Sequence, residues 1–335
     1  MTTNRRAFVS SAVAAAAATW LPRGAIAAAP AVKLFDTHAH FYTNEPDKYP
    51  FNARGARYGA ERMIAKATAN PMTPKTVFAF WDEVGVQMGT GVQYNSTYGT
   101  DNSYLLDVSK QYPKRILPVV ILDPVDAATP ATLRKWAKDN HLTAVRYSGS
   151  PNPQADNLPF FSDDAQNMWA TCNELGLCVV LMILGNNTAP ALKKVAEHAD
   201  RYANVKIALD HIAFPHPERL PESFGLTSEH VALAAHKNVY YKFTSFLISE
   251  MQDYAKQAEK PAVELKPFVE HMVKVFGADH LCWGSDHGNV EVDDVAYVKR
   301  FVDAASGLSK KDRSAFFFDT ARSVFVPGGR GKARA

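Results

Sequence analysis

Along the chain, short apolar runs that favour strands alternate with longer segments of helical spacing. The short runs are rich in Val, Ile, Leu, Phe and Tyr, and they fall at residues 32–40, 91–95, 116–122, 143–147, 178–184, 205–211, 239–243 and 280–286. Between them, apolar residues recur three or four positions apart, as on one face of a helix. Eight strands separated by helices is the number that closes a barrel, so we expect a single α/β domain with the (β/α)8 TIM-barrel fold.

Several predicted helices carry start or stop signals. A Thr-Pro pair at residues 73–74 opens a segment that we expect to be helical to about Met88, and residues 131–139 have one apolar face. Residues 163–175 form a third predicted helix, which ends at Gly176. The repeat of roughly thirty residues per strand and helix suits parallel strands joined by crossover helices.

A doubly wound sheet is the main alternative fold, and the glycine pattern argues against it. That fold usually has a glycine-rich turn after its first strand, whereas this first strand ends in DTHAH at residues 36–40. The glycines at 89–91 lack the third glycine of a dinucleotide-binding turn, and we interpret them as a turn before a strand. The GSDHG sequence at 284–288 is not a nucleophile elbow, because its serine is displaced by one position.

The first 29 residues have the features of an export signal. The pair Arg5 and Arg6 precedes a mildly apolar stretch rich in Ala and Val, as in twin-arginine signals. A membrane anchor is the competing interpretation, but the stretch is shorter than the roughly twenty apolar residues that a span needs. We therefore expect the twin-arginine machinery to export a barrel domain of residues 30–327 to the periplasm. Residues 328–335 are glycine-rich and basic, and we expect a disordered tail there.

Composition narrows the possible partners. The 335 residues include 37 basic and 34 acidic side chains, and the formal charge of +3 equals the number of arginines in the predicted signal. The exported chain would be neutral, which gives no electrostatic reason to expect binding to nucleic acid or stable association with a membrane. The three cysteines, Cys172, Cys178 and Cys282, lie in apolar segments. We expect buried thiols, with a bridge between Cys172 and Cys178 as the alternative.

Three residues at strand ends could form a reactive centre. His38 and His40 are two apart in the first strand, so both imidazoles project from one face. Asp286 ends the eighth strand, which neighbours the first in a closed barrel. Two imidazoles can hold a divalent metal or polarise a carbonyl, and a carboxylate can bind a metal or take a proton from water. The alternative for Asp286 is a cap on the following helix.

Polar residues at other strand ends could complete the site. Asp210 and His211 end the sixth strand, and strand alternation should send only one of them inward, which we expect to be His211. Arg146 ends the fourth strand and could hold a carboxylate or form a structural ion pair. Tyr98 and Asn102 follow the second strand, where they could line the pocket or start the next helix. We expect substrate specificity to lie in loops, including residues 46–72 and 245–267.

Taken together, these residues resemble the amidohydrolase superfamily, and within it the amidohydrolase-related group of lactonases and decarboxylases. The resemblance covers most of the chain and lies in six motifs that occur in the family's order: FDTHAH at 35–40, YGTDN at 98–102, AVR at 144–146, LDH at 209–211, VYYK at 239–242 and WGSD at 283–286. The YGTDN and LDH motifs resemble the lactonases more than the decarboxylases. Lys242 matches a family position without an assigned role.

The resemblance implies roles for the candidate residues. Asp286, His211, His38 and His40 would be catalytic, Arg146, Tyr98, Asn102 and His287 would bind substrate, and His38, His40 and Asp286 would bind a metal such as zinc. One departure matters, because metal-binding members commonly have a histidine on the fifth strand, where this chain has Met182. A thioether is a soft, weak ligand for a hard ion. The resemblance therefore implies a site that works either with a divalent metal or without one.

The resemblance leads to three functional hypotheses, each with a small-molecule ligand. The first is a hydrolase that opens a lactone or related cyclic ester, with a carboxylate on the substrate, by means of water activated by Asp286. The second is a metal-dependent decarboxylase of an unsaturated carboxylic acid, which Met182 disfavours. The third is a binding protein that has kept the barrel but has no catalytic activity.

Overall fold

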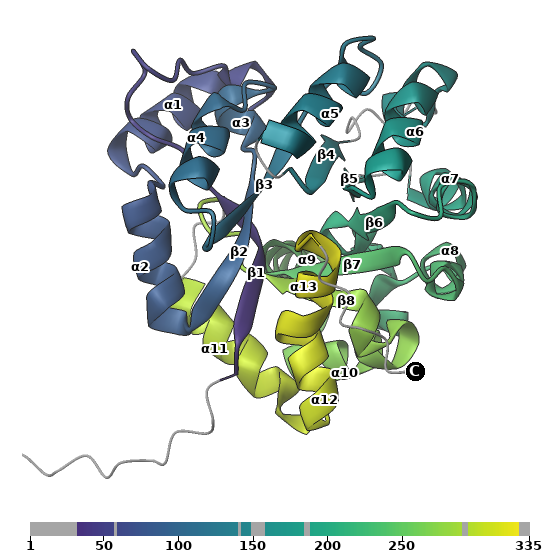
Figure 1. The fold of residues 1–335 in the computed structure, drawn as a ribbon. Helices are drawn as coiled ribbons and strands as arrows, with labels where there is room; N and C mark the ends of the chain where they lie inside the picture. Colours follow the sequence, from purple (N-terminus) through teal and green to yellow (C-terminus); the bar gives the residue numbers. More distant parts are fainter. Residues whose placement is uncertain are drawn as a thin grey trace, which may run out of the picture. The chain divides into compact units, whose positions relative to one another are not determined.

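A computed structural model of the 335-residue chain describes residues 32–56, 59–139, 142–148, 158–183, 188–289 and 294–327. In these residues, eight parallel strands follow one another in one sheet, in the order in which they occur in the chain (Figure 1). The strands are β1 (Leu34–His40), β2 (Val86–Val92), β3 (Ile116–Ile121), β4 (Ala144–Ser148), β5 (Cys178–Met182), β6 (Lys206–Leu209), β7 (Val239–Thr244) and β8 (Leu281–Gly284). The predicted (β/α)8 barrel is therefore confirmed.

Helices surround the strands and connect them in sequence. They are α1 (Ala60–Ala69), α2 (Pro74–Val84), α3 (Asn95–Tyr98), α4 (Ser103–Gln111), α5 (Thr129–Asp139), α6 (Gln166–Leu175), α7 (Thr188–Arg201), α8 (Ser228–Ala232), α9 (Ser245–Gln257), α10 (Leu265–Phe276), α11 (Asp294–Ala304), α12 (Lys310–Ser314) and α13 (Thr320–Phe325). The predicted helix stop at Gly176 is confirmed, because this residue ends α6 with a φ of 62°. The segments 46–72 and 245–267, which we expected to be loops, contain the whole of α1 and the whole of α9.

The barrel closes where β8 meets β1, partly through side chains. Ala39 forms a parallel bridge with His287, and the Thr37 hydroxyl donates to the Trp283 carbonyl over 2.8 Å. The backbone N–H of Ser285 donates to the Asp36 carboxylate over 2.9 Å. These bonds hold the carboxyl ends of the first and last strands side by side.

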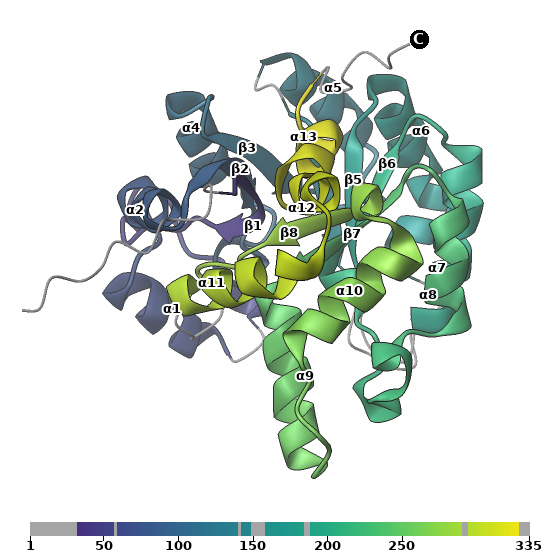
Figure 2. The same cartoon turned by 90° about the horizontal axis from the view of Figure 1, so that it is seen from below.

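The interior of the barrel is apolar at one end and polar at the other. Alternate strand residues, among them Val119 and Val180, pack inside with Phe325 of α13. This helix lies across the end of the barrel that faces the viewer in Figure 2. The candidate catalytic residues lie at the opposite, carboxyl ends of the strands, where sites in this fold are built.

The second strand and the preceding helix differ from the sequence prediction. The helix expected to reach Met88 ends at Val84, and β2 already begins at Val86. The expected turn at 89–91 lies inside this strand, so that interpretation was wrong. Both glycines make room for close packing: a Cβ on Gly89 would lie 2.3 Å from the Asp36 carbonyl oxygen, and one on Gly91 would lie 2.5 Å from a methyl of Ile116.

The structure tests the prediction about the cysteines but not those about the two ends of the chain. Cys172, Cys178 and Cys282 are buried free thiols, so the predicted thiols are confirmed and the alternative bridge is absent from the described residues. The predicted export signal and tail lie outside the described residues and stay predictions. Within the described part of the chain, none of the helices is long and apolar enough to cross a membrane.

Candidate active site

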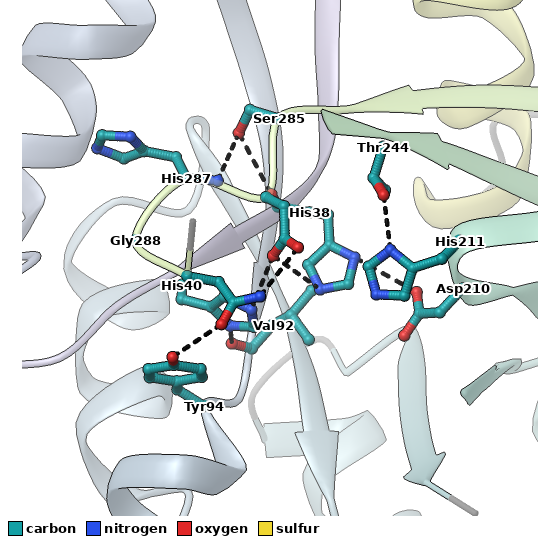
Figure 3. A network of polar contacts seen from close by, with 12 residues as sticks. His38, His40, Val92, Tyr94, Asp210, His211, Thr244, Ser285, His287 and Gly288 are labelled. Carbon is teal, nitrogen blue, oxygen red and sulfur yellow. Dashed lines mark hydrogen bonds and ion pairs between the residues drawn. The ribbon is translucent and has the colours of Figure 1, made fainter. Parts of the chain in front are cut away.

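His38 and His40 lie at the carboxyl end of β1 and point into the barrel mouth, as their spacing predicts (Figure 3). His40 is fixed by the neighbouring strand, because its Nδ1 lies 2.9 Å from the Val92 carbonyl oxygen and its ring stacks on Tyr94 at 4.4 Å. A carbonyl oxygen can only accept a hydrogen bond, so Nδ1 of His40 carries the proton. In the neutral ring, the Nε2 lone pair therefore faces the barrel mouth.

Asp286 follows β8 and meets both imidazoles. Its Oδ1 lies 3.2 Å from Nε2 of His40 and 3.6 Å from Nε2 of His38. Its other oxygen accepts a bond from Asn289, whose side chain accepts one from Tyr94. The residue has a φ of 56°, which is strained for a side chain other than glycine and is often found at functional sites. The three residues that we predicted to meet at the barrel seam do so.

The pKa values of this group favour an ionised carboxylate beside neutral imidazole. Burial works to raise the pKa of Asp286, but interactions with His38 and His40 hold it below its usual range. Burial, assisted by the charge of Lys242, lowers the pKa of His38 to about 3. At neutral pH, Asp286 is therefore a base, and His38 is uncharged.

Asp210 and His211 both reach the cluster, so the prediction that only one would turn inward was wrong. Strand β6 ends at Leu209, and residues 211–214 then have positive φ angles, which breaks the alternation of a strand. The ring of His211 lies 5.1 Å from the ring of His38, and its Nδ1 lies 2.6 Å from the Thr244 hydroxyl. Burial lowers the pKa of His211 to about 4.

Two cations hold Asp210 in place. Arg146 Nε and Lys242 Nζ each lie 2.7 Å from one of its carboxylate oxygens. Burial of Asp210 opposes ionisation, but these two charges keep its pKa well below its usual range. Lys242, which has no role assigned from the sequence, is fully buried in the centre of the cluster. The signal that could have found it is a lysine inside an otherwise apolar strand.

One set of side chains fits a divalent metal ion. His38, His40 and Asp286 can each offer one donor atom, and these three atoms lie within 4.8 Å of one another. Among the described residues, Nε2 of His38 and Oδ1 of Asp286 have no hydrogen-bond partner, although both are buried. In a neutral His40 ring, the Nε2 lone pair would face the negative oxygen of Asp286, an arrangement that a cation would stabilise. Two nitrogens and one oxygen are a donor set that zinc accepts.

A second set, formed by His38, Asp210 and His211, also has its donor atoms within 4.8 Å. Its carboxylate is already neutralised by Arg146 and Lys242. An ion there would have to compete with both cations, so the set that contains Asp286 fits a metal better.

Four predicted substrate-binding residues lie around this cluster in different ways. Arg146 reaches it but is directed at Asp210 and at the sulfur of Met182, 3.0 Å away. The Tyr98 hydroxyl accepts a hydrogen bond from the backbone N–H of Thr43. The side-chain amide of Asn102 donates to the Ile121 carbonyl and accepts from the Ile121 N–H.

His287 points away from His38 and His40 in Figure 3. Its ring stacks on Phe80 and meets Asp294 at 2.5 Å. The substrate-binding roles of Arg146, Tyr98, Asn102 and His287 stay predictions.

A cavity of about 530 Å³ lies beside the cluster, between the segment after β6 and one face of α9. Its apolar lining includes Phe214, Leu247, Met251 and Tyr254, and Glu218, Glu250 and Asp253 add negative charge. The ring of Phe214 lies 4.9 Å from the ring of His211, so the cavity adjoins the polar cluster there. Both walls follow the carboxyl ends of strands, on the same face as the cluster.

Comparisons with known proteins agree with this architecture. Residues 35–326 match the family model described as amidohydrolase. No curated protein matches the sequence. A structure from Pseudomonas putida, proposed to be a 2-pyrone-4,6-dicarboxylic acid hydrolase, superposes with a TM-score of 0.66 at 22% identity over 90% of this chain and 99% of the other.

Two further structures carry metals. An amidohydrolase from Burkholderia multivorans with bound zinc has a TM-score of 0.65 at 19% identity, covering 87% of this chain and 98% of the other. A dihydroxybenzoic acid decarboxylase from Polaromonas sp. JS666, with bound manganese and the inhibitor 2-nitroresorcinol, has a TM-score of 0.59 at 15% identity over 88% and 97% of the two chains. At these identities the likeness concerns the fold.

Proposed function

The chain belongs to the amidohydrolase family of enzymes, and on that premise we propose that it is a hydrolase that opens a lactone or a related cyclic ester. The observation that supports this reaction most directly is the state of Asp286. Its Oδ1 is buried, has no hydrogen bond from the described residues and lies between two imidazoles at the mouth of the barrel. A buried, ionised carboxylate in this position can take a proton from an attacking water.

The imidazoles of β1 and β6 surround the place where the substrate carbonyl would lie. In this proposal, His38 and His40 stabilise the negative charge that develops on the carbonyl oxygen when water attacks. His211, held by Thr244, assists proton transfer to the leaving oxygen. Because the Asp210 carboxylate fixes the guanidinium of Arg146 at the edge of the cluster, Arg146 is the group that we assign to a carboxylate of the substrate.

His38, His40 and Asp286 would hold a divalent metal, for which we propose zinc. A bound ion of this kind would polarise the carbonyl and make the attacking water more acidic. In the structure, His40 is held by the Val92 carbonyl and Asp286 by the turn after β8.

Decarboxylation is the second candidate reaction. The donor set for a metal and the likeness in fold to a manganese-containing decarboxylase favour it. The thioether of Met182 on β5 argues against it, because this side chain is a weak ligand where a strong one would hold the ion.

One series of measurements separates these reactions. The metal content of the purified protein is determined first, and lactones with and without a carboxylate are then tested before and after chelation. We expect ring opening in the untreated protein and its loss in Asp286→Asn, while Asp303→Asn, which changes an exposed aspartate of α11, keeps full activity. Release of carbon dioxide without ring opening would favour the decarboxylase, and tight binding without any product would favour a binding protein.

A further inference from the structure

We propose that Lys242 is a positioning residue that keeps the proton of His38 on Nε2, so that His38 acts as a hydrogen-bond donor and binds a divalent metal weakly. The proposal rests on the proposed function only in taking this cluster as the reacting centre. Lys242 lies in β7 and is completely buried, and its Nζ is 3.0 Å from Nδ1 of His38. Lys242 therefore acts on the substrate through His38.

The hydrogen-bond roles follow from the chemistry of the two groups. An ammonium group carries only donors, so Nδ1 of His38 has to accept the bond from Lys242. A neutral imidazole has one proton, and that proton then lies on Nε2. The Nε2–H group points into the barrel mouth toward Oδ1 of Asp286, 3.6 Å away. There it can donate to the carbonyl oxygen of a substrate.

When both rings are neutral, the two histidines of the same motif are therefore in opposite tautomers. His40 donates a hydrogen bond from Nδ1 to the Val92 carbonyl, so a neutral His40 ring has its lone pair on Nε2. His38 accepts at Nδ1, which leaves a proton on Nε2. A metal needs a lone pair from each ring, so a neutral His40 can bind one as it stands, whereas His38 would first have to move its proton to Nδ1, which weakens binding.

A route to the metal-binding state also lies in this cluster. Oδ1 of Asp210 is 3.4 Å from Nδ1 of His38 and could accept a proton from it, as carboxylates do behind metal-bound histidines. Nζ of Lys242 lies 2.7 Å from that oxygen, competes with His38 for it as an ion-pair partner and would place a positive charge close to the ion. The hydrogen-bond partner of a metal-binding histidine changes the metal affinity by about 10-fold to 100-fold. Here that partner is the cation Lys242, which lowers the affinity.

The first test needs no variant. Nitrogen NMR of the histidines in chelator-treated protein distinguishes the two tautomers, and the signals of His38 and His40 are assigned with His38→Gln and His40→Gln. We expect a proton on Nε2 of His38 and on Nδ1 of His40. A proton on Nδ1 of His38 would overturn the proposal, and a merely structural role of Lys242 would leave both rings in the same tautomer.

The second test measures zinc affinity in Lys242→Met, which replaces the ammonium by an uncharged chain of similar length. We expect binding at least about tenfold tighter than in the unaltered protein, because Asp210 is then free to accept from His38. The control is Lys206→Met at the start of β6, where the lysine bonds to backbone oxygens of Ser323 and Val324. That variant should bind zinc as the unaltered protein does.

An affinity that is unchanged or lower in folded Lys242→Met would contradict the proposal. If this variant does not fold, the tautomer measured in the unaltered protein decides the question. Neither measurement uses a substrate, so failure of this inference and failure of the proposed lactone chemistry are distinguishable.

Discussion

Two fully buried aspartates stand on either side of the seam between β1 and β8, and they are used in opposite ways. Asp36 accepts four hydrogen bonds: Oδ1 from the backbone N–H groups of His38 and Ser285, and Oδ2 from the Trp81 indole and the Ser285 hydroxyl. Oδ1 of Asp286 accepts none from the part of the chain that the structure describes, and its nearest charged or polar neighbours are imidazole nitrogens.

The difference shows how one fold separates stability from reactivity. The donors around Asp36 satisfy its carboxylate completely, so this residue ties β1, α2 and the end of β8 together. Asp286 is left with an unsatisfied oxygen, which costs stability but leaves a group that can bind water or an ion. Burial is equal at the two positions, so hydrogen-bond satisfaction, rather than burial, marks the reactive carboxylate.

The strongest test of this comparison is Asp286→Asn. An amide cannot take a proton from water, so we expect turnover to fall about a thousandfold, within the usual range for a general base. The melting temperature should fall little, because the amide can still accept the bond from Asn289. Ring opening and thermal unfolding, measured on the same preparation, check the expected turnover and the expected melting temperature. Turnover within tenfold of the unaltered enzyme would remove Asp286 from its role.

For Asp36→Asn we expect the opposite: a large loss of stability and little loss of turnover. The amide would face donors with another donor and leave at least one of them unsatisfied in the interior, which should cost about 3 kcal/mol of stability. Denaturant unfolding measures this loss, and the fraction that remains folded should open lactones at a nearly normal rate per molecule. A stable but inactive Asp36→Asn would mean that the two aspartates are not separated as the structure indicates.

His38 contacts both aspartates, and His38→Ala separates the role of its backbone at Asp36 from the role of its ring at Asp286. Its backbone N–H serves Asp36, and its ring serves the reacting centre. Removing the ring keeps the backbone bond, so we expect at least about a hundredfold loss of turnover. Thr90→Val is the matched control at the same strand pair, because it removes a bond to the backbone of residue 37 without touching the reacting centre. If the two variants lost turnover equally, the ring would have no special role.

The barrel, and the meeting of β1 with β8, could be predicted from the sequence because both depend on local patterns. Alternating apolar segments set the number of strands, and closure of eight strands brings the last one beside the first. His38, His40 and Asp286 therefore met as predicted. The start of β2 was missed because Gly89 and Gly91 suggest a turn locally, whereas they are required by packing against Asp36 and Ile116.

The second half of the site could not be derived from strand alternation. Asp210 and His211 both turn inward because the backbone becomes left-handed after β6, which a sequence pattern does not reveal. The buried charge of Lys242 is explained by the charge of Asp210, which directly follows the neighbouring strand β6. The role of Asp36 likewise depends on Trp81 and Ser285, which lie 45 and 249 positions away in the sequence.

The smallest expected effect comes from Ser285→Ala, which sharpens the comparison because Ser285 is next to Asp286 in the chain. Its hydroxyl donates to Asp36 over 2.5 Å and accepts from the backbone N–H of His287 over 3.0 Å. Asp36 would keep three donors, so we expect a loss of about 1 kcal/mol in stability and turnover within about twofold of normal.

Ser323→Ala, which removes a partly buried hydroxyl from α13, is the control for the loss of one such bond. A fall in turnover as large as that of Asp286→Asn would show that the hydrogen-bond network of Asp36 and the reacting carboxylate of Asp286 act as one unit. If only the unfolding midpoint shifts, Ser285 serves the Asp36 network alone. Proximity to Asp286 in the sequence would then say less about its function than the carboxylate to which its hydroxyl is bonded.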